Sequence, residues 1–176
     1  MNTSERLIIS FKGLKEGWHD FNFKLTQKFF QTIDYSEFKN GSLDVKIRME
    51  RKTTHLVFNF EIVGIVNVLC DRCLEFFDTD LKFSGNLFVK FSREYEEENI
   101  NEELLILSPE DNEIDLTHYI YESVCLSLPY QHFHPLDVKG KSTCNKSMLK
   151  KLKELSKHKI EEIDPRWEKL KKLNKN

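Results

Sequence analysis

The sequence predicts an α+β fold, with an antiparallel β-sheet or partly open barrel in the N-terminal half and helices in the C-terminal part packed on it. Three observations support this prediction. Apolar and polar residues alternate along much of the first ninety residues, as in half-buried strands. Beyond residue 115 apolar residues recur every four positions, as on one helix face. A hydrophobic content of 39%, with 14 Phe among 176 residues, is sufficient for a packed core.

The alternating segments predict five or six short strands. The clearest is 42–50, where Leu43, Val45, Ile47 and Met49 share one face. Similar alternation marks four other segments, at 7–11, 21–25, 56–62 and 81–91. Gly64 interrupts an apolar run and predicts a bulge or a sharp bend. Between the second and third strands, residues 27–38 are expected to form a short helix.

After the strands, the sequence predicts an acidic surface loop over 92–114 and a helix over 115–128. Nine carboxylates and no Lys or Arg lie between Glu94 and Glu113, which favours a solvated excursion. Asp115 is a suitable N-cap for the helix, and Pro129 ends it. Its apolar face is formed by Leu116, Ile120, Val124 and Leu128.

Charge divides the chain into a β-rich core domain, 1–137, and a basic helical extension, 138–176. The extension has 13 basic and 5 acidic residues, a net charge of +8, whereas the first 137 residues have a net charge of −10. Asn145 can cap one helix in the extension, and Asp164-Pro165 can begin another that Trp167 and Leu170 would anchor.

A cationic extension on an acidic body indicates an anionic partner, of which nucleic acid is the commonest. A lysine-rich helix that is merely well solvated is the alternative. If nucleic acid binds, lysines would contact phosphates without reading sequence. The candidate nucleic-acid-binding residues are Lys139, Lys141, Lys146, Lys150, Lys151, Lys153, Lys157 and Lys159.

The sequence Cys70-Asp71-Arg72-Cys73 is the main candidate for chemistry. It follows an apolar run and precedes a strand pattern, so both thiols are expected at one tight turn, as in half of a zinc site. A redox pair usually opens a helix, which lowers the thiol pKa. No helical or βαβ pattern follows here, which favours metal binding, although a redox pair and two plain reduced cysteines stay open as alternatives.

A complete zinc site needs two further ligands, and Cys144 and His134 are the preferred candidates, with His132 as the alternate for the histidine. Together with Cys70 and Cys73 they would form a Cys₃His site. Four protein ligands leave no position for a reactive water, so zinc would be structural. The competing interpretation is that the histidines simply lie near a turn.

No sequence motif indicates catalysis, and we expect a protein that is not an enzyme and has no small-molecule substrate. Nucleotide-binding, nucleophile-elbow and metalloprotease motifs are all absent from the sequence. His118, Glu122 and Cys125 share one helix face and could form a small polar or metal cluster, but the solvent side of the helix or a contact with the sheet is the better interpretation.

The sequence also predicts where the protein is located. The N-terminus shows no signal-peptide pattern, and no apolar stretch approaches the ~20 residues that span a bilayer, so we expect a cytoplasmic protein without a membrane partner.

The order of these motifs resembles the YceD family of large-subunit ribosomal RNA accumulation proteins. The similarity is carried by Val68-Leu69-Cys70-Asp71-Arg72-Cys73-Leu74-Glu75, the acidic segment, the 115–128 helix ending in Ser127-Leu128-Pro129, the Cys-bearing loop, and Asp164-Pro165-Arg166-Trp167. The resemblance implies a cytoplasmic, non-enzymatic factor supporting 23S rRNA accumulation and ribosome biogenesis, with metal and nucleic-acid binding suspected. Its partner would be large-subunit rRNA or a pre-ribosomal particle. Many relatives have a second cysteine pair where this chain has only Cys144.

Two other functions stay open. The acidic loop could dock a basic ribosomal protein, making the chain a protein-interaction module with indirect effects on RNA. Alternatively, the chain could be a thiol-redox protein, which requires an abnormally acidic thiol at Cys70 or Cys73.

Overall fold

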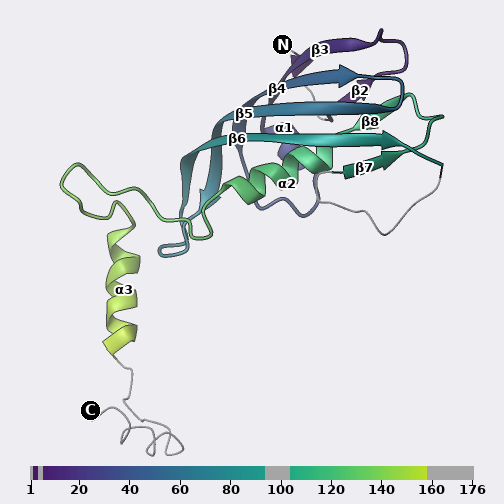
Figure 1. Ribbon diagram of the computed structural model, residues 1–176. Helices are drawn as coiled ribbons and strands as arrows, with labels where there is room; N and C mark the ends of the chain where they lie inside the picture. The colour runs from purple at the N-terminus through teal and green to yellow at the C-terminus, as the bar shows by residue number, and fades with distance from the viewer. Residues whose placement is uncertain (1, 4–5, 94–103, 158–176) are drawn as a thin grey trace, which may run out of the picture. The chain divides into compact units, whose positions relative to one another are not determined.

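The computed structural model describes residues 2–3, 6–93 and 104–157 and confirms the predicted α+β class. Its main feature is a six-stranded sheet of order β1-β3-β4-β5-β6-β7 (Figure 1). The four central strands pair antiparallel, and the short edge strands pair parallel. Within the described residues the two edge strands do not pair with each other, so the sheet is open. The strands are β1 (Asn2–Thr3), β3 (Gly17–Leu25), β4 (Gly41–Arg51), β5 (His55–Leu69), β6 (Phe76–Phe91) and β7 (Leu104–Leu107).

A second, two-stranded sheet pairs β2 (Ile8–Ser10) with β8 (Glu113–Asp115). The segment 92–114, predicted to be an acidic loop, therefore also contains two strands, β7 and the start of β8. The four-residue apolar run of β7 and the buried Ile114 outweigh the local negative charge. Residues 94–103, which hold six of the nine carboxylates, lie outside the described residues.

The core lies on one face of the large sheet, as the period-2 patterns predict. Alternate residues of β4 are buried from Leu43 to Met49, and alternate residues of β5 from Leu56 to Ile62. Phe58 and Phe60 are almost fully buried at the centre of the sheet. The residues that alternate with the buried ones along β4 and β5 lie on the opposite face, so this sheet has one face packed against the core and one face toward solvent.

Two helices belong to the face packed against the core. Helix α1 (Gln27–Gln31) buries Phe29 and Phe30 but ends seven residues earlier than the predicted 27–38. There the Thr32 hydroxyl donates to the Phe29 carbonyl, and the chain turns between Ile33 and Ser36.

Helix α2 (Thr117–Ser127) packs on the sheet through the predicted apolar face. Its Tyr119 ring lies 4.9 Å from the Phe60 ring, centroid to centroid. Asp115 is not the N-cap residue, a position that Leu116 occupies. Its carboxylate nevertheless accepts a hydrogen bond from the Thr117 backbone N–H at 2.8 Å, so it satisfies one of the free donors at the helix start.

Gly64 lies within β5. Of the two features predicted there, a bulge or a sharp bend, the bulge is absent, because pairing with β4 and β6 continues in register across the glycine. The glycine is required for a different reason. Its φ is +158°, and a Cβ atom there would lie 2.1 Å from the Ser42 carbonyl oxygen. Gly64 therefore permits β4 and β5 to approach each other closely.

The described residues form two compact units. The first comprises those up to Cys70 together with Phe76–His132, and the second comprises Asp71–Glu75 together with those from Phe133 onward. The second unit contains helix α3 (Lys146–Lys157), the predicted Asn145-capped helix. The sequence-based division at residue 137 stays a prediction, and the helix predicted from Asp164 lies outside the described residues. No helix in the described part of the chain has the length and apolarity needed to cross a bilayer.

Candidate metal centre

The first cysteine pair lies in the connection between β5 and β6, as the sequence predicts. Leu69 pairs with Phe76, so Cys70–Glu75 form a six-residue loop that closes this hairpin. No helix begins at either cysteine, so the helix N-terminus that lowers the thiol pKa in many redox pairs is absent here. Leu74 has a φ of 58°, which costs a residue with a Cβ about 1–2 kcal/mol.

The second pair of candidate ligands is brought together by a hairpin-like turn. The Asp137 carboxylate accepts hydrogen bonds from the backbone N–H groups of Lys139 and Lys141, and Gly140 supplies a positive φ of 72°. On either side of this turn, Leu136 bridges Ser142, and the Thr143 hydroxyl donates to the Pro135 carbonyl at 2.7 Å. The turn therefore places His134 beside Cys144, although ten residues separate them in sequence.

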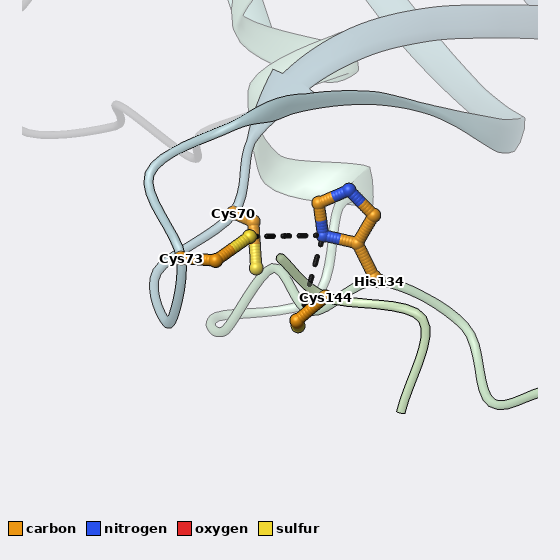
Figure 2. Close-up of side chains that lie close together, drawn as sticks. All are labelled: Cys70, Cys73, His134 and Cys144. Carbon is orange, nitrogen blue, oxygen red and sulfur yellow. Dashed lines mark hydrogen bonds between the residues drawn. The ribbon is translucent and has the colours of Figure 1, made fainter. Parts of the chain in front are cut away.

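The four predicted ligands lie together, with their ligand atoms within 4.8 Å of one another. In Figure 2 the four side chains lie close together, and dashed lines join the His134 ring to Cys73 and to Cys144. The His134 Nδ1 atom lies 3.5 Å from the Cys73 sulfur and 3.8 Å from the Cys144 sulfur. A tetrahedral zinc with usual bond lengths separates its ligand atoms by about 3.5–3.8 Å. The alternate ligand, His132, is not part of the group.

The chemistry of this donor set fits zinc. Three thiols and one imidazole are a common structural zinc set, and soft sulfur ligands disfavour magnesium or calcium. All three cysteines are buried, at 0–3% exposure, so the donors point away from water. Cys70, Cys73, His134 and Cys144 would hold the zinc, which would cross-link these parts of the chain. With four protein ligands, no coordination position would stay open for a substrate.

Apart from the thiol cluster, the second unit has no buried apolar core among its described residues. Among its described residues, Cys73 and Cys144 are the only buried ones. A segment of this size without an apolar core usually requires a metal or a disulfide to fold, and none of the described cysteines forms a disulfide. The burial pattern therefore indicates that contacts at the thiol cluster hold this unit together.

Asn145 connects this cluster to helix α3. Its side-chain oxygen accepts hydrogen bonds from the backbone N–H groups of Ser147, at 2.8 Å, and Met148, at 3.4 Å, which is the predicted N-cap. Its amide nitrogen donates to the carboxylate of Glu75 in the Cys70–Glu75 loop. The same side chain thus starts the helix and attaches it to the cysteine turn, a role that the sequence does not reveal.

Most of the predicted nucleic-acid-binding lysines are exposed. Lys139 and Lys141 lie on the Asp137 turn, and the others fall on or near α3. Lys150 pairs with Glu154 at 3.9 Å. Within the described residues the remaining exposed lysines of the set have no acidic side chain at ion-pair distance: Lys139, Lys141, Lys146, Lys151 and Lys153. The side chain of Lys157 and the whole of Lys159 are outside the described part.

The polar face of α2 supplies no residue to the candidate metal centre. His118 pairs with Glu122 at 2.9 Å and with the Tyr35 hydroxyl at 2.7 Å, and its side chain is exposed, as the solvent-face interpretation predicts. Burial raises the pKa of Tyr121, and partial removal from water raises that of the Cys125 thiol. A raised pKa leaves less thiolate, so Cys125 is a weak metal ligand and a weak nucleophile.

Fold and site together define an α+β protein with a candidate Cys₃His metal centre and an adjoining cationic helix. The family model described as "Large ribosomal RNA subunit accumulation protein YceD" matches residues 58–174, which is about two-thirds of the chain and includes all four candidate ligands. The chain belongs to the YceD family, as the sequence motifs predict, and the family description supports a ribosome-related role. No curated protein and no solved structure gives a significant match.

Proposed function

We propose that this protein is a non-enzymatic, cytoplasmic factor in which a structural zinc presents a cationic helix to large-subunit (23S) rRNA or a pre-ribosomal particle. The observation that carries this proposal is the convergence of Cys70, Cys73, His134 and Cys144, together with the family membership. Zinc would take the place of a hydrophobic core in the second unit, because Cys73 and Cys144 are the only buried residues among those described there.

The electrostatics of the second unit support RNA as its partner. Its described residues include eight Lys or Arg and four Asp or Glu, a net charge of +4. Lysines held on a helix gain affinity from the release of counterions around RNA phosphates. Such contacts position RNA without reading its sequence, which is consistent with a role in rRNA production or stability.

The proposal is tested by measuring RNA affinity against salt concentration. Replacing Lys146, Lys151 and Lys153 with Gln should reduce the slope of log affinity against log salt by about 2–3, since each phosphate contact contributes about 0.7–0.9. A matched control replaces three exposed lysines of the sheet, Lys46, Lys82 and Lys90.

The control variant should leave the salt slope unchanged. Equal slopes for the wild type and the helix variant would remove α3 from RNA binding. A lack of any salt-dependent RNA binding by the zinc-loaded wild type would contradict the proposed function as a whole.

A further inference from the structure

Arg72 and Phe133 meet on the outer surface of the second unit, beside the candidate metal centre. The guanidinium carbon of Arg72 lies over the Phe133 ring, 4.6 Å from its centroid. Arg72 is located between Cys70 and Cys73, and Phe133 directly precedes His134, so the candidate ligands fix the backbone on both sides of the contact. Both side chains remain exposed, Phe133 at 38%.

A third exposed side chain belongs to the same turn. Leu74 is 61% exposed and has the positive φ of 58° that a residue with a Cβ rarely adopts. The turn therefore holds an apolar side chain toward solvent in a conformation that is unfavourable in itself. Strained backbone conformations of this kind cluster at active sites, ligand clamps and switch regions.

The chemistry of the three side chains restricts the ligand. A phosphate alone needs only positive charge, which the lysines of this unit supply. An aromatic ring under a guanidinium group additionally offers a flat surface, on which unpaired nucleobases stack in RNA-binding proteins. Arg72 has no acidic partner within the described residues, and the unit is cationic, so the charge complements RNA rather than a basic protein.

We propose that Arg72, Phe133 and Leu74 form a stacking platform for an unpaired base of single-stranded RNA. This platform rests on the proposed function and specifies the RNA: the lysines of α3 would contact phosphates, and the platform would select unpaired over double-stranded segments. A duplex cannot use it, because the faces of its bases are covered by their neighbours.

The wild-type protein tests the platform without any substitution. A ten-nucleotide single-stranded uridine RNA is compared with an oligonucleotide of the same length and charge that has abasic sugars throughout. Stacking predicts about tenfold tighter binding of the RNA that carries bases, with the same salt slope for both. Equal affinity for the two would overturn the platform.

Substitution provides a second, independent test. Arg72→Lys keeps the charge and removes the planar group, so it should weaken binding of the uridine RNA about five- to tenfold and leave binding of the abasic oligonucleotide unchanged. The matched control is Arg48→Lys, because the Arg48 guanidinium lies over the Trp18 ring at 4.8 Å on the sheet of the first unit. Zinc content measured on both variants verifies that the metal centre is intact.

The outcomes separate the platform from the proposed function. The platform is overturned if both oligonucleotides bind with equal, salt-dependent affinity. It is also overturned if Arg72→Lys and Arg48→Lys weaken RNA binding equally. In either case the proposal that α3 binds RNA is unaffected. Binding of an acidic peptide that Arg72→Lys abolishes, with RNA binding unaffected, assigns this surface to a protein partner and also overturns the platform. If neither oligonucleotide shows salt-dependent binding, the platform and the proposed function are both overturned.

Discussion

Replacing Asn145 with Ala should unfold the start of α3 while leaving the metal ligands in place. The Asn145 side chain provides the N-cap of α3 and the hydrogen bond to Glu75, and Ala can make neither contact. All of these groups belong to the second unit. The effect should therefore appear in the helix and in RNA binding before it appears in the sheet.

The expected magnitude follows from the contacts. Loss of an Asn N-cap costs about 1 kcal/mol. The exposed hydrogen bond to the Glu75 carboxylate contributes about another 1 kcal/mol, below the range of about 1.5–3 kcal/mol for charged partners, because water competes. A total of about 2 kcal/mol changes the helix–coil equilibrium about 30-fold. A helix of 12 residues is marginal in water, so this change is sufficient to unfold the first turns of α3.

Amide hydrogen exchange measures this directly. The Ala variant should lose protection through the first turns of α3. Asn145→Ser keeps a cap but lacks the amide group that donates to Glu75, so it should lose about half as much free energy. Asn22→Ala on the exposed face of β3 is the matched control and should leave α3 unchanged. Full protection of α3 in the Ala variant would refute the role of Asn145.

Three further predictions concern the sheet, the core and the metal. Gly64→Ala should destabilise the protein by more than about 3 kcal/mol in denaturant titration, because its Cβ would meet the Ser42 carbonyl, whereas Gly13→Ala, with open space around it, should have little effect. Burial raises the pKa of the Tyr121 hydroxyl, so the stability that this neutral group contributes is complete below about pH 10 and declines as the pH rises further. The free energy of unfolding should therefore fall less between pH 9 and 11 in Tyr121→Phe than in the wild type. A strong chelator should make α3 sensitive to protease while the near-ultraviolet signal of the sheet core persists, and simultaneous loss of both would show that the metal is needed by the whole chain.

The sheet could be predicted from the sequence because its physical signal is local. Alternation from Leu43 to Met49 determines which residues of β4 are buried, whatever their partners are. The same reasoning failed at β7 and β8, where short apolar segments inside an acidic region gain their stability from strands distant in sequence. It also could not show why Gly64 is a glycine, because close approach to Ser42 is a tertiary property.

The ligands of the candidate metal centre could be predicted from the sequence, but the turn and the contacts that bring them together were not predicted. Cysteine spacing identified Cys70 and Cys73, and a loop with Cys144 identified the other half. The turn that joins His134 to Cys144 had a readable signal, Asp137 followed three residues later by Gly140, that the sequence reasoning did not use. The Arg72–Phe133 contact had none, since it joins residues 61 positions apart.

The central claim is that zinc, held by three thiols and one imidazole, organises the part of the protein that presents α3. The most direct measurement is elemental analysis of the purified chain, with Cys144→Ser and, as a matched control outside the cluster, Cys125→Ser. We expect about one zinc per chain in the wild type and in the Cys125 variant, and a large loss in the Cys144 variant. A wild type that neither contains zinc nor takes it up, or a Cys144 variant that retains it fully, would contradict the claim.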